Sequence, residues 1–401
     1  MNQKKALSIV FGLGVYLAVT GASAWAFGAF EVPATGVVPA AQIGEGGGLV
    51  IDPGEPKDQP CPINGKLFTK TERAAWEQRR PLFVMIENHT DARPQSGLAQ
   101  ADAVYEAVAE GGITRFGVVF YCGAIAKDIK LGPVRSARTY FLDWASEYNF
   151  PFYVHVGGGN CSRDEGTKQC TSDPRAMAIE QIEKYGWGGS KGNDLNQFSI
   201  GYPTFWRNYE RLGRTVATEH TMETTTEKLW AVGEKRGWKA EGNNGEEWSK
   251  KFIQWVFTGP STSSGQAERG TVNNISFEFW EGYQDFAVRW EYNLQTNLYS
   301  RIMGGEPHKD LETGTQITAS VIAVQFVKEE GPVDIHKHMI YGTTGKGDAL
   351  VFQNGQAIKA KWQKADRIAR TKFTDEQGKE ISFVGGQMWI EVVPAGNTVE
   401  Y

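Results

Sequence analysis

The chain has 401 residues, a length that predicts two or three domains and excludes a single small module. Apolar residues make up 40% of the chain and charged residues 22%, which is ordinary for a protein with a sizeable core and excludes global disorder. The 42 basic and 47 acidic side chains give a formal net charge of −5, so the sequence lacks the broad basic field of a nucleic-acid-binding protein.

The amino-terminal segment predicts contact with a membrane. Residues 6–30 carry no charge and are long enough to cross a bilayer as a helix. Lys4 and Lys5 precede this stretch and acidic residues follow it, so the positive-inside rule places the body of the protein outside the cytoplasm. Small residues at 22–26 also resemble a signal-peptidase site. Residues 1–30 are therefore either a retained single-pass anchor or a cleaved signal peptide that releases a secreted protein.

A linker and four cysteines follow the apolar stretch. Residues 31–60 are rich in glycine and proline and lack periodicity, which predicts a flexible linker. Cys61, Cys122, Cys161 and Cys170 lie beyond it, in a compartment that favours disulfides. Cys161 and Cys170 are the disulfide candidate because the loop between them is the shortest, although the sequence alone leaves the connectivity open. Metal binding by the cysteines is the weaker interpretation, since no Cys-x-x-Cys motif occurs.

Residues 61–240 alternate helical and strand patterns, which predicts an α/β domain with a mixed sheet. A capping box at Thr69–Glu72 opens a helix, and an apolar strand follows at 82–86. Strand-forming runs at 103–110 and 113–121 flank a Gly-Gly pair and predict a hairpin. The remaining elements expected here are helices at 136–149, 173–185 and 221–236 and a buried strand at 152–156.

Residues 272–396 read as a β-rich domain. Asn354-Gly355 is the strongest hairpin signal in the chain, and residues 259–270 predict a loose connection between the two domains. The predicted strands are 273–279, 286–292, 316–327, 349–352, 356–362, 381–383 and 388–393. The expected fold class is therefore mixed α+β, with an N-terminal α/β domain, a β-rich C-terminal domain, and a membrane helix or signal peptide in front.

The predicted hairpin carries charged side chains on one face. A tight turn would place Glu106, Glu110 and Arg115 on the same face, with Arg115 opposite Val108. The two carboxylates would then lie about 13 Å apart, too far for the paired acids of a glycosidase. The residues suit either an anion site or a simple Glu-Arg-Glu ladder that stabilises the hairpin.

The segment Gly132-Pro133-Val134-Arg135-Ser136-Ala137-Arg138 is a candidate anion site. Gly-Pro predicts a loop, and Ser136 is placed to cap the following helix. Arg135 and Arg138 beside free amide donors would suit a carboxylate or a phosphate, and Arg93 leaves another strand in the same way. The alternative is that these arginines pair with acidic residues of the same domain.

Two residues are candidates for acid–base chemistry. His155 ends a buried strand before three glycines, and Glu110 lies at the tip of the hairpin, so either could act as a general base. A buried histidine that is hydrogen-bonded into the core is the alternative for His155. Asp334, His336 and His338 alternate as zinc ligands can, but ordinary polarity at a strand edge is the preferred interpretation. No cofactor and no metal site is predicted.

Several segments carry a resemblance to a known family, among them Ala92-Arg93-Pro94-Gln95-Ser96-Gly97-Leu98 and the Gly132–Arg138 loop. Together they resemble the YerB-like family of bacterial lipoproteins, and they cover most of the chain. The segments are 80–89, 92–98, 104–106, 110–116, 132–138, 153–155, 205–207, 306–310, 351–355 and 387–394. The resemblance implies a two-domain envelope protein of no established activity.

The sequence departs from the family pattern at two places. The usual lipid-attachment cysteine is missing, so anchoring would depend on the apolar stretch at 6–30. The family's Pro-His pair is replaced by Glu219-His220, which weakens any role assigned to His220.

Three functions are consistent with these patterns, and whether the protein is an enzyme stays open. The first is a membrane-tethered module outside the cytoplasm that binds an anionic ligand, such as a cell-wall polymer or a peptide carboxylate. Its candidate ligand-binding residues are Arg93, Glu106, Glu110, Arg115, Arg135, Ser136 and Arg138. The second is a cell-wall hydrolase with Glu110 or His155 as general base. The third is a non-catalytic structural adaptor for another envelope protein.

Overall fold

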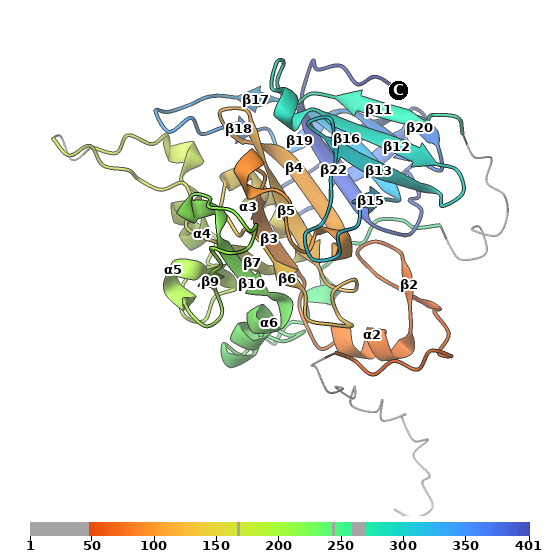
Figure 1. The fold of residues 1–401 in the computed structure, drawn as a ribbon, viewed down its shortest axis with the longest axis horizontal. Coiled ribbons are helices and arrows are strands. Elements are labelled where there is room, and N and C mark those ends of the chain that lie inside the picture. The colour runs from red at the N-terminus through yellow and green to blue at the C-terminus, as the bar shows by residue number, and fades with distance from the viewer. Residues whose placement is uncertain (1–47, 167–168, 243–244, 259–269) are drawn as a thin grey trace, which may run out of the picture. The chain divides into compact units, whose positions relative to one another are not determined.

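The computed structural model describes residues 48–166, 169–242, 245–258 and 270–401 (Figure 1). The expected anchor or signal peptide and residues 31–47 of the expected linker lie outside these ranges. Within them, no helix has the length and apolar character needed to span a membrane. Residues 48–60 belong to the folded body, because Leu49 donates a backbone hydrogen bond to Ala126 and strand β1 (Gln59–Pro60) pairs with β2 (Leu67–Phe68).

A mixed ten-stranded sheet runs through both halves of the sequence. Strands of the N-terminal half continue into strands of the C-terminal half, and the parallel pair formed by β22 and β4 joins them (Figure 1). The two predicted domains therefore share one sheet. Its strands, in spatial order, are β21 (Lys372–Asp375), β20 (Gln356–Lys364), β19 (Gly345–Gln353), β16 (Val321–Val327), β22 (Met388–Pro394), β4 (Ala103–Glu110), β5 (Ile113–Phe120), β3 (Leu82–Glu87), β7 (Phe152–His155) and β8 (Asp194–Asn196).

A second, five-stranded sheet is built only from the C-terminal half. Trp290 of this sheet packs edge-to-face against Trp389 of the large sheet, with ring centroids 5.3 Å apart. Aromatic pairs of this kind bury much apolar area, so they hold the two sheets together. The strands are β11 (Asn274–Phe277), β12 (Val288–Asn293), β13 (Leu298–Met303), β14 (Glu306–Pro307) and β15 (Thr318–Ala319).

Short helices and small sheets complete the fold. The capping box predicted at Thr69 and Glu72 is present at the start of α2. The fold class is confirmed as mixed α and β with a β-rich C-terminal half. The helices are α2 (Lys70–Trp76), α3 (Thr139–Ala145), α4 (Ala178–Lys184), α5 (Gln197–Ile200) and α6 (Thr226–Lys235). The small sheets are β6 (Lys130–Leu131), β10 (Met222–Thr225) and β9 (Trp206–Arg207), and separately β17 (Glu329–Glu330) with β18 (Ile340–Tyr341).

Several predicted elements differ from the structure in their bounds, and two differ in type. The helix expected at 221–236 starts only at Thr226, because Met222–Thr225 forms β10 and the Thr225 side chain caps the helix. β-branched residues favour strand, which explains why the threonine run ends β10 rather than extending α6. The strand expected at 381–383 is a single bridge between Phe383 and Phe257.

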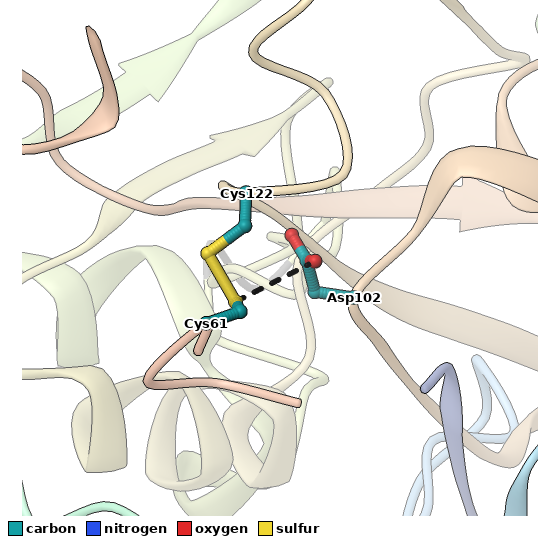
Figure 2. Close-up of side chains that lie close together, drawn as sticks. All are labelled: Cys61, Asp102 and Cys122. Carbon is teal, nitrogen blue, oxygen red and sulfur yellow. Dashed lines mark hydrogen bonds between the residues drawn. A yellow bond between two sulfur atoms is a disulfide. The ribbon is translucent and has the colours of Figure 1, made fainter. Parts of the chain in front are cut away.

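The disulfide joins Cys61 to Cys122. The bond predicted between Cys161 and Cys170 is not formed and both cysteines are free, although their thiols contact one another. Loop-closure entropy alone therefore does not determine which cysteines are bonded. Figure 2 shows Asp102 beside the disulfide.

Asp102 organises the chain around this disulfide. Its carboxylate accepts hydrogen bonds from the Asn64 side chain at 2.7 Å and from the backbone amides of Tyr121 at 2.6 Å and Gly123 at 3.0 Å. Burial raises the pKa of Asp102 to about 7, although these hydrogen bonds act to lower it. The residue ties the segment before α2 to the end of β5.

Candidate functional site

The register of the β4–β5 hairpin separates the charged residues that the sequence placed together. Arg115 lies opposite Ala107 rather than Val108, and the register shifts between Val108 and Glu110. Residues opposite one another share a face, so Glu106 and Arg115 point to opposite faces of the sheet. The shift brings Glu110 back to the face of Arg115, where the two side chains lie 3.1 Å apart. The predicted Glu-Arg-Glu ladder is therefore wrong.

Glu106 belongs to a buried ionic network between the two sheets. Arg301 of β13 pairs with Glu106 and, at 2.5 Å, with Glu391, and the side chains of all three are 0% exposed. Asn88 donates to Glu106 at 3.2 Å, and the Trp290 indole donates to Glu391 at 3.0 Å. Burial raises the pKa of Glu106 to about 8 against the lowering effect of Arg301. Glu106 is thus enclosed and cannot reach a ligand.

Arg93 lies on the same side of the large sheet as this network. Its Nε donates to Asn88 Oδ1 at 3.1 Å, and one terminal nitrogen donates to the carbonyl of Asp285 at 2.7 Å. The guanidinium also stacks on Phe286, 4.8 Å from the ring centroid. Arg93 therefore joins the two halves of the chain and does not meet the other predicted arginines.

Glu110 is held by two guanidinium groups. Arg115 and Arg138 both form ion pairs with its carboxylate, and Arg115 also donates to the carbonyl of Ser136 at 3.2 Å. A carboxylate neutralised on both oxygens is a poor proton acceptor. This cluster lies behind the loop that carries Ser136 and holds that loop in place. It contains no residue that is free to act as a general base.

His155 is fully buried, with both ring nitrogens engaged. Nδ1 lies 2.6 Å from the carbonyl oxygen of Gly157, and Nε2 lies 2.6 Å from Oδ1 of Asp194. Both neighbours are hydrogen-bond acceptors, so the ring has no free nitrogen for proton abstraction. Neither residue predicted as a base is placed to act as one.

A hollow of about 600 Å³ lies where the parallel strands β7 and β8 end. Open α/β sheets bind ligands at the carboxyl ends of their strands. The segment Val134–Ser136, the residues that follow β7, and the start of α5 line one side. Arg207 of β9, with Thr218 and Glu219 of the 3₁₀ helix Thr218–His220, lines the other.

Arg135 brings its guanidinium to this hollow on a fixed backbone. Its amide donates to Met85 at the end of β3, and its carbonyl accepts from Val156 after β7. The side-chain Nε lies 2.7 Å from Glu87 Oε2, and the side chain is 29% exposed. Within the described part of the chain, the two terminal nitrogens have no hydrogen-bond partner. They are free to bind an anion in the hollow.

Ser136 lines the hollow next to Arg135, and its hydroxyl has no hydrogen-bond partner among the described residues. The prediction that Ser136 caps the following helix is wrong, because α3 begins three residues later and Arg138 occupies the cap position. The hydroxyl is therefore available as a donor beside the guanidinium.

Arg207 is a second cation at the hollow, and the prediction from sequence missed it. One of its terminal nitrogens donates to the carbonyl of Thr218 and lies 3.4 Å from the Thr221 hydroxyl. Burial lowers the pKa of Arg135, and the positive charges of Arg115 and Arg207 lower it further against the opposing effect of Glu87. A bound anion would relieve this repulsion. The one available signal was that Arg207 lies in a segment that resembles the family.

Glu87 anchors the back of the hollow. Its buried carboxylate contacts Arg135 and accepts from Nδ1 of His220 at 3.3 Å. Although burial acts to raise the pKa of Glu87, the hydrogen bond from His220 and the charges of Arg115 and Arg135 lower it below its usual value. Glu87 stays ionised and holds Arg135 in position.

The aromatic wall of the hollow depends on Gly157. Its φ of +58° is left-handed, and a Cβ at this position would lie 2.9 Å from the Phe198 ring. Oδ1 of Asn196 accepts from the amides of both residues, at 3.2 and 3.1 Å. Phe198 is therefore fixed against the glycine, although it is 75% exposed.

His89, Asp91 and His220 place their ligand atoms within 4.8 Å of one another beside this site. The two imidazole rings stack with centroids 4.8 Å apart and planes 18° apart, so their lone pairs lie in separate, nearly parallel planes and do not converge on one point. Nδ1 of His89 already accepts from the Asp91 amide at 3.1 Å. A shared metal would require convergent lone pairs, and we assign no metal here.

The site thus contains only part of the predicted set. Arg135 and Ser136 line the hollow, Glu110, Arg115 and Arg138 lie behind it, and Arg93 and Glu106 belong to the contact between the two sheets.

Two family models match the chain. The model described as "Protein of unknown function (DUF3048) N-terminal domain" matches residues 68–239, and the corresponding C-terminal domain matches residues 275–390. The chain belongs to this family, which is the YerB-like family that the sequence motifs resemble.

A relative and a solved structure agree with this membership. The chain is 28% identical over 348 residues to "Putative lipoprotein YerB" of Bacillus subtilis (strain 168), which covers 85% of this chain and 88% of the relative. The crystal structure of the Bacillus subtilis YerB protein matches with a TM-score of 0.65 at 24% identity, over 86% of this chain and all of that one. The structural match shows the fold, and the similarity to a putative lipoprotein supports an envelope location without establishing an activity.

Proposed function

We propose that this protein is tethered to the membrane through residues 6–30 and binds a carboxylate-bearing component of the cell wall outside the cytoplasm. The observation that carries the proposal is that Arg135 and Arg207, from separate segments of the chain, line one hollow. The relative described as a lipoprotein supports the envelope location.

The geometry favours a carboxylate ligand over a neutral one. The terminal nitrogens of Arg135 are the donors that form paired, charge-assisted hydrogen bonds with a carboxylate. The adjacent Ser136 hydroxyl can donate to the same group. Glu87 pairs with the Nε of Arg135, but a neutral ligand would leave the terminal nitrogens of Arg135 and the charge of Arg207 without an anionic partner in the hollow.

Retention on isolated cell wall tests the proposal. The full chain in detergent is compared with the double variant Arg135→Ala and Arg207→Ala, which we expect to bind at least tenfold more weakly. Arg289→Ala is the matched control, because Arg289 is half exposed on β12 and pairs only with Glu291 among the described residues. Equal retention of the double variant and the wild type would remove both arginines from the site.

A further inference from the structure

Glu219 lines the same hollow as Arg135 and Arg207. It is exposed, and its carboxylate has no ion-pair or hydrogen-bond partner among the described residues. The next residue, His220, is buried and bonded to Glu87, so the backbone that presents Glu219 is held in place. The hollow therefore offers an unpaired anion as well as two cations.

Glu219 and the two arginines of the hollow are close enough to interact electrostatically. Burial is the main cause that lowers the pKa of Arg135, and among the smaller effects the charge of Glu219 raises it while that of Arg207 lowers it. The negative charge of Glu219 therefore also acts on a ligand that contacts Arg135.

The lining also includes five apolar side chains, beside the polar residues Ser136, Asn160, Asn196 and Thr218. Val134 and Met222 are buried, Val156 and Ile179 are half-buried, and Phe198 presents an exposed ring. Such walls stabilise a ligand by removing hydrocarbon from water. A ligand that matches the hollow thus has charged groups of both signs and an apolar portion.

These features discriminate between classes of cell-wall component. A phosphate polymer carries repeated negative charge, which Glu219 would repel, and offers little apolar surface to Phe198. A neutral sugar satisfies neither Glu219 nor Arg135. A short peptide with a free amine, a free carboxylate and aliphatic side chains matches all three parts of the lining.

Resting on the proposed function, we infer that the ligand is a short zwitterionic peptide, with its carboxylate on Arg135 and Arg207 and its ammonium group on Glu219. The aliphatic side chains pack against Phe198 and the neighbouring apolar residues. Glu219 is then the residue that distinguishes a free amine from a blocked one.

Calorimetric titration of the full chain in detergent tests the inference. The probe is alanyl-alanine, as each stereoisomer, in free, N-acetylated and C-amidated forms. We expect wild-type protein to bind the best free stereoisomer about tenfold more tightly than its N-acetylated form. Glu219→Gln should bind both equally, because it removes the partner of the ammonium group. Glu281→Gln, an exposed acidic position on another part of the surface, should retain the wild-type preference.

The outcomes separate the inference from the proposed function. If N-acetylation leaves wild-type affinity unchanged, or if no form binds at millimolar concentration, the inference is overturned. The same holds if Glu219→Gln keeps the wild-type preference. If instead C-amidation leaves affinity unchanged and Arg135→Ala binds like the wild type, the carboxylate site itself is refuted and the proposed function fails with it.

Discussion

Replacing Arg301 by methionine tests the role of the buried network between the two sheets. Arg301 is the only described cation that pairs with Glu106 and Glu391, and its guanidinium also lies 4.3 Å from the Trp389 ring centroid. Methionine keeps much of the apolar stem but leaves two carboxyl groups facing one another in the core. The contact between the two halves should therefore weaken.

The magnitude follows from the burial of these residues. All three side chains are 0% exposed, so the remaining acids cannot be solvated in the folded state. Removing one partner of a buried ion pair costs about 3–5 kcal/mol, a large part of the typical 5–15 kcal/mol that stabilises a domain. We expect the variant to lose at least about 3 kcal/mol of unfolding free energy at pH 7.

Urea denaturation followed by tryptophan fluorescence measures this loss, with Arg289→Met, on the exposed face of β12, as the control. The control should stay within about 0.5 kcal/mol of the wild type, because an exposed ion pair contributes little.

The pH dependence has a defined sign. Burial already raises the pKa of Glu106 to about 8, and removal of Arg301 takes away the charge that lowers it. A carboxyl whose folded pKa is raised binds more protons in the folded state, so stability falls as pH rises from about 4.5 through that pKa. The deficit of Arg301→Met should therefore widen as pH rises through about 8, where Glu106 ionises in the wild type but stays protonated in the variant. A deficit below about 1 kcal/mol at pH 7 would refute the assignment.

Two further predictions concern the disulfide region. Because Cys61 and Cys122 are 61 residues apart, the double variant to alanine should lose about 4 kcal/mol of unfolding free energy by the loop-entropy relation, as measured by urea denaturation; an unchanged midpoint would contradict the pairing. Asp102→Asn should lose about 2–3 kcal/mol, because both Asp102 oxygens accept hydrogen bonds and an amide NH₂ would face a donor such as the Tyr121 amide. Since burial raises the pKa of Asp102 to about 7, this residue should make wild-type stability fall from about pH 4 to pH 7, and a slope that persists in the variant would contradict that origin.

Local patterns predicted local structure well. The capping box at Thr69 and the Asn354-Gly355 turn between β19 and β20 both depend on residues close in sequence, and both are present. The same holds for the hairpin formed by β4 and β5. Signals of this kind report backbone preferences, so they do not depend on distant contacts.

The charged site could not be predicted because it depends on an irregularity in strand β4 and on contacts between residues far apart in the sequence. The irregularity before Glu110 moves its side chain to the face of the sheet on which Arg115 lies. No pattern in the sequence at this position predicts the irregularity. Glu106 on β4 meets Arg301 through a contact between the two sheets. The large sheet itself depends on the parallel pairing of β22 with β4, two strands that are far apart in the sequence. Arg301 itself lies on β13, a strand that the sequence analysis missed.

The structure of this protein with a bound carboxylate tests the central claim most directly. Crystals soaked with N-acetyl-alanyl-alanine, which carries a carboxylate but no ammonium group, isolate the arginine site from the role of Glu219. We predict the carboxylate within hydrogen-bonding distance of the terminal nitrogens of Arg135 and of Arg207, with Arg115 and Arg138 still paired to Glu110. A carboxylate bound elsewhere, or a hollow that stays empty at saturating concentration, would contradict the account.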